Sequence, residues 1–360
     1  MKENILTILR CPKCSGHFQV LESQKKNGEI HSGKLGCQSC QATFPIRNYI
    51  PRIIEDGNYS ESYGKLWCET GHLLRDSETG VPFHYNIVYG QFTENGKGIK
   101  DGYSPFGFEW PKQGNGEWVL EVGSGPGALT EALIKSGAEV VSIDMSYAVD
   151  SMPEDLLIAP NLNVVQADIN QPFLKEDMFD RILLIQVLQH TPSPKDTLKR
   201  LRQLLKPQGE LAFTCYSEPF EKWYYPITKR LNLNLSWSLI LHLVPIFVPL
   251  KYHLQKFFLK IRLPIFARIV NKLLEPFDAR NLYFQTLEGK LDSWVYGAVW
   301  NKTKDKKLFL KYVALNTFDC ITPWYTNSGT HKMVEEWSHY AGFESVKTWG
   351  TTGVRARAIK

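Results

Sequence analysis

The start of this 360-residue chain lacks the features of a secretory leader. Met1–Arg10 has no basic opening, no long apolar run and no small-residue cleavage site, so we expect a cytoplasmic protein. Acidic residues are missing from a second place, because residues 222–274 hold nine Lys or Arg and no Asp or Glu. That stretch more than accounts for the formal net charge of +5.

A good membrane-spanning run is also missing. Residues 231–250 carry no formal charge, but polar residues and prolines interrupt them and make a spanning helix a poor fit. After that run, a helical projection of residues 250–261 places five apolar side chains on one arc, namely Leu250, Leu254, Phe257, Phe258 and Ile261. The cations outside the arc are Lys251, Lys256, Lys260 and Arg262. Four interpretations remain open: a lid over an apolar substrate, an amphipathic helix on an anionic membrane, a nucleic-acid face, or a solvated basic face.

Seven cysteines are an odd number, which disfavours a disulfide framework. Four of them form two Cys-x-x-Cys pairs separated by a 22-residue spacer. Each pair aims two thiolates at one point, and two pairs supply the closed tetrahedral shell of a structural Zn²⁺. The predicted ligands are Cys11, Cys14, Cys37 and Cys40. Such a metal would stabilise a unit too small to fold alone.

Short apolar runs rich in β-branched residues alternate with helical segments from Glu117 onward. The runs cover residues 118–122, 139–143, 163–166, 181–185 and 210–214. Continuous apolar strands separated by helices predict a parallel sheet covered on both faces. A helix over 332–341 precedes two further runs, 344–348 and 354–358, and a Gly-containing turn joins them. These last runs predict a closing antiparallel hairpin.

The expected fold is therefore α/β, a doubly wound sheet with additions. The expected parts are a zinc ribbon over 1–57, an N-terminal extension over 58–115, a cofactor-binding core over 116–217, a basic and largely helical insertion over 218–310, and the end of the core over 311–360. The insertion is too long for an ordinary connection, so we expect it to cover a substrate.

A glycine-rich loop follows the first run, in Glu121-Val-Gly-Ser-Gly-Pro-Gly127. Glycine permits a tight turn and lets a ligand lie against bare backbone, but the motif alone also fits a dinucleotide site. Two carboxylates narrow the choice. Asp144 ends the second run and is suited to accept hydrogen bonds from ribose hydroxyls, and Asp168 ends the third run.

Together these motifs resemble the class I S-adenosylmethionine-dependent methyltransferases, particularly their small-molecule branch. The resemblance spans residues 116–217 and resumes in 311–360. It implies that the methionine end of S-adenosylmethionine contacts Glu121, Gly123, Gly125 and Gly127. It also implies that Asp144 holds the ribose, Met145 and Ile169 the adenine faces, and Asp168 the adenine amino group.

The first 55 residues resemble the small zinc-ribbon protein that activates several methyltransferases. The likeness rests on Leu9-Arg-Cys-Pro-Lys-Cys14, on the second cysteine pair and on Phe44-Pro-Ile-Arg-Asn-Tyr-Ile-Pro51. Asn48-Tyr49 departs from the Asp-Gly that is common in that family, which alters a turn and leaves the metal site intact.

Candidate groups for catalysis and substrate binding follow the fourth run and precede the late helix. His190 lies just past the fourth run, where it is either a general base or a loop histidine that bonds backbone. Asp319, Tyr325 and His331 lie in a stretch that resembles a pattern of uncharacterised small-molecule methyltransferases, which implies substrate contact.

The predicted function is methyl transfer from S-adenosylmethionine to a small or lipid-like organic acceptor, with an oxygen or carbon acceptor favoured. The reason is that no Asn/Asp-Pro-Pro-aromatic motif, typical of enzymes that methylate exocyclic amines, follows the fourth run. The alternative is an RNA base methyltransferase, because the insertion is basic and a similar fusion occurs in a ribosomal RNA methyltransferase. A third is a scaffold that binds the cofactor without catalysis. Peripheral membrane contact through the insertion is possible, and nucleic acid is the less favoured partner.

Overall fold

The computed structural model describes residues 1–54, 60, 64, 67–68, 70–90, 108–217, 237–274, 277–278, 281–288, 300, 302–321, 325–350 and 353–360, with the side chains of 72, 237–238, 282 and 318–321 left aside. Its strands are β1 (Phe18–Lys26), β2 (Glu29–Cys37), β3 (Thr43–Arg47), β4 (Ile50–Ile53), β5 (Trp118–Val122), β6 (Glu139–Asp144), β7 (Leu162–Ala167), β8 (Phe179–Leu184), β9 (Leu205–Tyr216), β10 (Ser345–Trp349) and β11 (Gly353–Ile359). Its α-helices are α2 (Asp76–Thr79), α3 (Phe83–Tyr89), α4 (Ala128–Ile134), α5 (Glu154–Leu157), α6 (Pro194–Leu204), α9 (Trp237–Lys260), α10 (Pro264–Leu273), α11 (Leu282–Leu287), α13 (Lys306–Ile321) and α14 (His331–Tyr340). Short 3-10 turns are η1 (Glu3–Thr7), η2 (Gly71–Leu73), η3 (Tyr147–Ser151) and η4 (Leu188–His190).

One sheet runs through the molecule in the order β1-β2-β3-β4-β7-β6-β5-β8-β9-β11-β10. The strands from β4 to β9 pair in parallel, and β11 and β10 close the far edge antiparallel. The doubly wound α/β fold and its closing hairpin are thus confirmed. From β5 the chain proceeds to β6 and β7 on one side and to β8 and β9 on the other. Such a reversal of strand order leaves a crevice at the carboxyl ends of the strands.

Each face of the sheet is covered, as the continuous apolar strands predict. On one face, α3 and α4 pack together and share a core with Val119, Val140 and Leu183. On the other face, α6 packs against α14, and the alternate side chains Leu120 and Val141 lie in that second core. Alternate side chains lie in different cores because successive residues of a strand point to opposite faces of the sheet.

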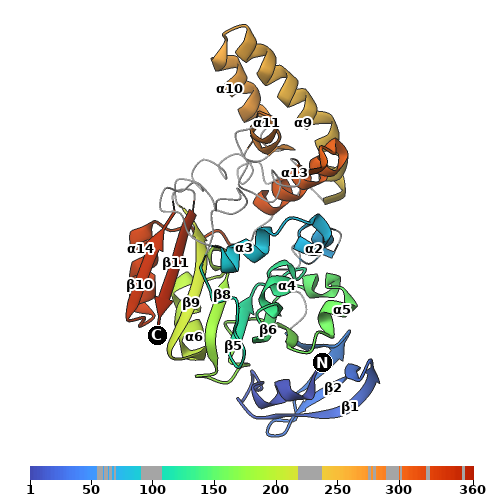
Figure 1. The fold of residues 1–360 in the computed structure, drawn as a ribbon, viewed down its shortest axis with the longest axis vertical. Helices are drawn as coiled ribbons and strands as arrows, with labels where there is room; N and C mark the ends of the chain where they lie inside the picture. The colour runs from blue at the N-terminus through green and yellow to red at the C-terminus, as the bar shows by residue number, and fades with distance from the viewer. Residues whose placement is uncertain are drawn as a thin grey trace.

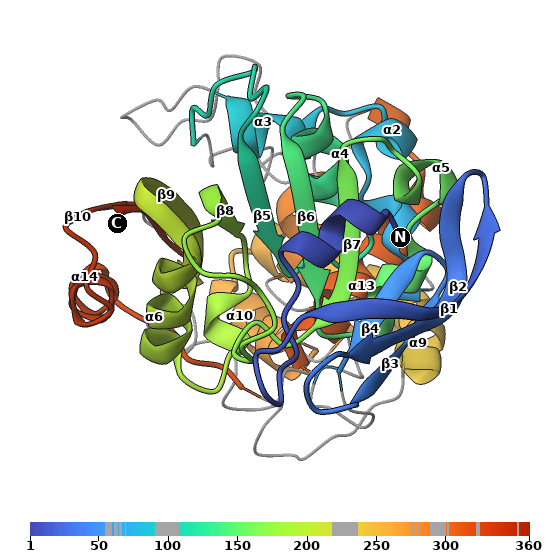
Figure 2. The ribbon, with the colours of Figure 1, turned by 90° about the horizontal axis from the view of Figure 1, so that it is seen from below.

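The N-terminal unit is not separate from this sheet. Its last strand, β4, pairs in parallel with β7, with Arg52 opposite Gln166 and Ile53 opposite Ala167, and Figure 2 shows the two strands side by side. Sequence reasoning ended the unit in a turn near residue 57, because a two-residue pairing with a strand more than a hundred residues away has no local signal.

The insertion begins, within the described residues, with the long helix α9. It packs on α10 and α13, and α10 returns antiparallel to its end. In Figure 1, α9 and α10 project at one end of the long axis, and β1 and β2 lie at the other. No helix of the described chain has both the length and the apolar character needed to cross a bilayer. Lys251, which the helical projection places outside the apolar arc, is 1% exposed and lies 3.5 Å from the Asp278 carboxylate. It is therefore not part of a solvated basic face.

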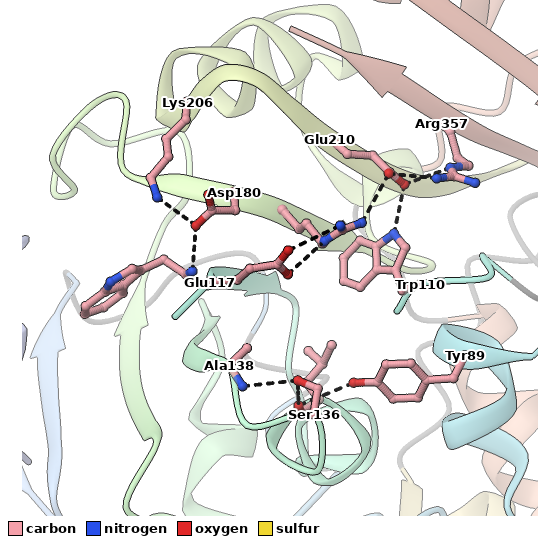
Figure 3. Close-up of polar contacts among 12 residues, drawn as sticks. Tyr89, Trp110, Glu117, Ser136, Ala138, Asp180, Lys206, Glu210 and Arg357 are labelled. Carbon is pink, nitrogen blue, oxygen red and sulfur yellow. Dashed lines mark hydrogen bonds and ion pairs between the residues drawn. The ribbon is translucent and has the colours of Figure 1, made fainter. Parts of the chain in front are cut away.

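A network of ion pairs ties the starts of the central strands together, at the edge away from the crevice (Figure 3). Arg181 bridges Glu117 and Glu210, at 3.0 and 3.4 Å. Glu210 also accepts from Arg357 at 2.8 Å and from the indole N–H of Trp110 at 2.8 Å. Since these residues come from β8, β9, β11 and the segments before β5, the network fixes the sheet that presents the crevice.

Candidate functional site

A cavity of about 250 Å³ opens at the carboxyl ends of β5, β6, β7 and β8. Six of the eight predicted cofactor residues line it, namely Gly123, Gly125, Asp144, Met145, Asp168 and Ile169. The other two, Glu121 and Gly127, are not among its lining residues. The crevice that strand order predicts is therefore present in the described structure, and most of the predicted residues meet there.

The glycine loop after β5 needs its glycines for two different reasons. Gly123 has φ +79°, and a Cβ there would lie 2.1 Å from Val187, so a side chain is excluded by strain and by space. Gly125 has φ +50°, and a Cβ there would meet nothing within 4 Å. Its backbone therefore faces open cavity, which is the arrangement that a ligand lying on bare backbone requires.

Asp144 is held in one orientation at the end of β6. Its Oδ2 accepts from the Gly125 N–H at 2.8 Å, and its Oδ1 accepts from the N–H and hydroxyl of Ser146 at 2.8 and 2.7 Å. Burial raises the pKa of Asp144, and the bonds from Ser146 and Gly125 oppose that shift. Three donors that hold a carboxylate at a cavity wall leave its remaining lone pairs to accept from a bound hydroxyl.

Glu121 lies behind the loop. It is 1% exposed, and its Oε2 accepts from the hydroxyls of Thr130 and Ser142, both at 2.6 Å. Burial raises the pKa of this carboxyl to about 7, while the bonds from Ser142 and Thr130 lower it. Its Oε1 has no hydrogen-bond partner among the described residues. The geometry makes Glu121 a support of α4 and β6, and the resemblance that gave it a cofactor contact did not foresee this.

A buried hydroxyl in the glycine loop bears on whether the cavity fits a polar ligand. Ser124 is a lining residue of the cavity, and its buried Oγ has no hydrogen-bond partner among the described residues. Buried polar groups are normally paired, so a ligand that supplies a partner here removes an unfavourable feature. The carboxylates of Asp144 and Asp168 and the hydroxyl of Ser124 suit a molecule with hydroxyl and amino groups, as S-adenosylmethionine has.

The adenine side of the cavity is built on β7 and the turn after β6. Asp168 Oδ1 accepts from the N–H and the side-chain amide of Asn170, at 2.9 and 3.0 Å. Gln166 Nε2 donates to the Met145 carbonyl at 3.2 Å, and Gln166 Oε1 accepts from Arg52 at 3.0 Å. Arg52 belongs to β4, so the N-terminal unit contacts the residues that shape this wall.

The predicted catalytic and substrate residues do not all lie at the cavity. His190 lines the cavity, and its Nδ1 lies 3.0 Å from the Tyr325 carbonyl. Tyr325 therefore supports His190 through its backbone. His331 bonds the Gly350 carbonyl at 2.8 Å and is not among the lining residues. The side chain of Asp319 lies outside the described residues.

Sequence reasoning missed a second histidine in the cavity. His84 lines it, and its Nδ1 lies 3.1 Å from Asp76 Oδ1. Asp76 also accepts from the N–H groups of His84 and Tyr85 at 3.0 and 2.8 Å, which caps α3. A carboxylate beside Nδ1 favours the tautomer with the proton on Nδ1 and the lone pair on Nε2. The only sequence signal was an Asp and a His eight positions apart in a segment without periodicity.

The four predicted metal ligands meet at the tip of the N-terminal unit. Their sulfur atoms all lie within 4.8 Å of one another, with Cys11 to Cys40 at 3.6 Å and Cys14 to Cys37 at 3.5 Å. A tetrahedral ion with metal–sulfur bonds of about 2.3 Å would separate its sulfurs by about 3.8 Å. The pKa of the Cys37 thiol is lowered to about 6, and the hydrogen bond from the backbone N–H of Cys40 is the main cause. Burial raises the pKa of the Cys11 thiol to about 12. A dication at the centre would favour the thiolate at all four positions.

Comparisons with known proteins agree with this geometry. Residues 120–213 match the family model described as a methyltransferase domain. A ubiquinone biosynthesis O-methyltransferase from Coxiella burnetii is 34% identical over 114 residues, which are 31% of this chain and 49% of that protein. Its namesake from Histophilus somni is 35% identical over 112 residues, 29% of this chain and 47% of that protein.

A solved structure of a SAM-dependent methyltransferase from Aquifex aeolicus is 26% identical in sequence, with a TM-score of 0.27. The likeness covers 29% of this chain and 58% of that one. The chain spans about half the length of the curated relatives it matches. The family match, the parallel sheet and the glycine loop together show that residues 120–213 resemble a methyltransferase domain in sequence and in fold.

Proposed function

We propose that this chain transfers a methyl group from S-adenosylmethionine to the hydroxyl oxygen of a small, lipid-like acceptor. The observation that carries the proposal is a single cavity in which the glycine loop and Asp144 meet two histidines and an apolar wall. That wall includes Trp67, Leu74, Phe83 and Ile87. The match to O-methyltransferases that bear the name of ubiquinone biosynthesis supports the same acceptor class.

The cofactor would supply an electrophilic methyl group on a cationic sulfur. Asp144 would accept from the ribose hydroxyls, because its carboxylate is already held toward the cavity by Gly125 and Ser146. Asp168 would accept from the adenine amino group, with Met145 and Ile169 on the two ring faces. The backbone at Gly125 would lie against the methionine part.

His84 would remove the proton of the acceptor hydroxyl. Its Nδ1 faces Asp76 Oδ1 at 3.1 Å, and its Nε2 makes no hydrogen bond to any described residue. The nearby carboxylate would stabilise the imidazolium that forms when Nε2 takes the proton. His190, held by the weaker dipole of the Tyr325 carbonyl, would then orient the acceptor.

The acceptor class follows from the shape of the wall opposite the glycine loop. Aromatic and aliphatic side chains of Trp67, of Leu74 and of α3 provide its surface, and the polar groups are few. A pocket of this kind binds an apolar body and uses one or two polar groups for orientation. A phenol that carries an alkyl chain matches both features.

We further infer that the four-cysteine cluster holds Zn²⁺ with a structural role. Four thiolates fill a tetrahedral shell and leave no open position for a water molecule. The cluster also lies on the N-terminal unit and not among the residues that line the cavity. The metal would therefore stabilise the fold of that unit and take no part in methyl transfer.

The test measures transfer of labelled methyl from S-adenosylmethionine to a catechol with a long alkyl chain. The wild-type protein should form a methyl ether. His84→Gln should lower kcat by about 10²–10⁴-fold and leave the dissociation constant of S-adenosylmethionine within a factor of about three. Asp76→Asn should lower kcat less than His84→Gln does, because the histidine keeps its ring but loses the carboxylate that orients it.

The matched control is His339→Gln, since His339 is exposed on α14, and it should behave as wild type. If His190→Gln abolishes turnover and His84→Gln does not, the base is His190 and the assignment of roles is wrong. If no hydroxyl-bearing acceptor is methylated while an amine or an RNA is, oxygen transfer itself is contradicted.

A further inference from the structure

The most unusual surface of the molecule lies on the projecting hairpin. We call residues 237–273, which comprise α9, α10 and their turn, the α9–α10 hairpin. Eleven of the thirteen exposed large apolar side chains of the described chain belong to it. They are Leu239, Ile246, Leu250, Phe257, Leu259, Ile261, Leu263, Ile265, Phe266, Ile269 and Leu273. Figure 1 shows that the hairpin stands away from the sheet, with its turn at the tip.

These side chains are exposed because the hairpin packs with only part of its surface. At the root of α9, Ile240, Val244 and Val248 are fully buried in the core that also includes α13. Toward the tip the burial ends, and α10 contributes Ala267 as its buried residue. Ile265 is 64% exposed and Leu273 is 71% exposed. So many exposed apolar side chains on one hairpin mark a partner or a lipid phase.

The charges of the same hairpin have a single sign. Residues 237–274 contain six Lys or Arg and no Asp or Glu. Lys251 is buried against Asp278, and Lys256 pairs with Glu288 at 3.0 Å. The other four cations, Lys260, Arg262, Arg268 and Lys272, are exposed and have no ion pair among the described residues. Their charge is therefore available to an anionic partner.

The tip is a formed structure. Arg262 adopts φ +58° after α9, the Leu263 N–H donates to the Phe258 carbonyl at 2.8 Å, and the Arg262 N–H donates to the Leu259 carbonyl at 3.2 Å. These two bonds make the Schellman arrangement that ends a helix. Phe258 and Phe266 then stack across the turn with ring centroids 5.5 Å apart. The apolar and cationic side chains are thus presented on a fixed hairpin.

We propose that the α9–α10 hairpin docks on an anionic lipid surface, with its apolar side chains at the level of the acyl chains and its four cations at the headgroups. Interleaved apolar and basic residues on helices are the pattern of interfacial binding. The internal prolines Pro245 and Pro249 and the absence of a spanning helix among described residues fit binding at the surface of one leaflet. An RNA would engage the cations but leave Ile265 and Leu273 in water.

The proposal goes beyond methyl transfer and does not depend on it. It does place the chain where a lipid-like acceptor resides. The hairpin is also joined to the cavity, because α9 packs on α13 and the hydroxyl of Tyr312 on α13 donates to the carbonyl of Leu73, next to the lining residue Leu74.

The test is co-sedimentation of the full chain, without cofactor, with two kinds of vesicle. One is phosphatidylcholine alone, and in the other about a third of the lipid is phosphatidylglycerol. We expect at least about tenfold stronger partitioning to the anionic vesicles at low salt. Ile265→Ser/Phe266→Ser should reduce binding to anionic vesicles about tenfold or more. Lys260→Gln/Arg262→Gln should remove most of the preference for anionic lipid.

Matched controls come from exposed residues elsewhere. Leu21→Ser/Tyr340→Ser removes the two exposed large apolar side chains that the described part of the chain has outside the hairpin. Lys199→Gln/Lys332→Gln removes two exposed cations on α6 and α14. Both double variants should bind vesicles as wild type does. All variants should bind S-adenosylmethionine equally, which separates a failure of docking from a failure of the methyltransferase assignment.

Three results would overturn the proposal. Equal, weak binding to both vesicle types would remove the lipid surface as partner. Concentration-dependent dimerisation that Ile265→Ser/Phe266→Ser abolishes, without vesicle binding, would assign the apolar surface to a second copy of the chain. A salt-sensitive complex with RNA that Lys260→Gln/Arg262→Gln abolishes, again without vesicle binding, would assign the cations to nucleic acid.

Discussion

The two additions to the central sheet differ in how far their apolar side chains are buried. In the N-terminal unit, Ile5, Leu9 and Phe18 are buried in the same core as the strands, and Leu21 is its one exposed large apolar side chain. The α9–α10 hairpin leaves eleven such side chains exposed. An addition that is covered contributes to the fold, whereas one that stays uncovered needs a partner to bury it.

The polar contacts differ in the same way. The N-terminal unit is joined to the sheet by the Arg52–Asp150 ion pair, by the bond from the Tyr49 hydroxyl to Glu154 at 2.6 Å, and by strand pairing. At the tip of the hairpin the cations are exposed, and its buried ion pair lies at the root. The comparison therefore predicts structural effects from changes in the first region and binding effects from changes at the tip of the second.

The largest effect should come from the metal ligands. Cys37→Ser/Cys40→Ser removes half of the tetrahedral shell, and a structural zinc site contributes on the order of 10 kcal/mol of apparent binding free energy. We expect loss of bound zinc, measured by elemental analysis, and loss of the N-terminal unit's protection in hydrogen exchange. Cys68→Ser, at an exposed thiol outside the cluster, should change neither. Full zinc retention in the double variant would contradict the ligand set.

The next effect concerns the root of the hairpin. Lys251→Met leaves the Asp278 carboxylate buried without its cation, which should lower the free energy of unfolding by about 3–5 kcal/mol. Lys260→Gln, on the same helix but exposed, should change it by less than about 0.5 kcal/mol. Chemical denaturation measures both. Equal changes in the free energy of unfolding from the two substitutions would contradict the distinction between the root and the tip of the hairpin.

Several of these features could be predicted from the sequence, and the reason is that their signals are local. The glycine loop, Asp144, Asp168 and the two cysteine pairs each occupy a few consecutive positions, and the strands and the late helix follow from periodicity. The apolar arc of residues 250–261 was also recognised, although Lys251 was placed on the wrong side of it. Its burial depends on Asp278, which lies in a different segment.

What sequence reasoning missed depends on contacts between distant segments. The pairing of β4 with β7 and the Asp76–His84 pair in the cavity have no repeating pattern to signal them. The substrate role of His331 stays a prediction; its ring bonds the Gly350 carbonyl, where α14 packs beside the closing hairpin. A family resemblance likewise places Glu121 near the cofactor and cannot show which way its carboxylate points.

Glu121 is buried in β5, behind the glycine loop, and its burial predicts a pH effect. Its pKa is about 7 in the folded chain against a reference value of 4.5. The folded protein therefore keeps a proton that the unfolded chain has lost, and stability falls as pH rises from about 4.5 to about 7. The drop should reach about 3 kcal/mol at most. Glu121→Gln should flatten that part of the stability curve, measured by denaturation across pH, and an unchanged slope would contradict the assignment.

A smaller effect should couple the N-terminal unit to the cofactor site. Arg52 donates to Gln166, and Gln166 donates to the Met145 carbonyl at the adenine wall. Arg52→Met should weaken S-adenosylmethionine binding by about 2–30-fold, measured by calorimetry. Arg47→Met, at an exposed position of β3, is the control. If both variants bind as wild type does, the unit supports the fold without influencing the site.

Binding of S-adenosylmethionine by the purified chain tests the central claim most directly. Calorimetry should show one site with a dissociation constant in the micromolar range, weakened by about 10–100-fold or more in Asp144→Ala, because a charged acceptor of hydroxyl hydrogen bonds is lost. Asp155→Ala, an exposed carboxylate on α5, should bind as wild type does. Tight binding of NADH with no binding of S-adenosylmethionine would contradict the account.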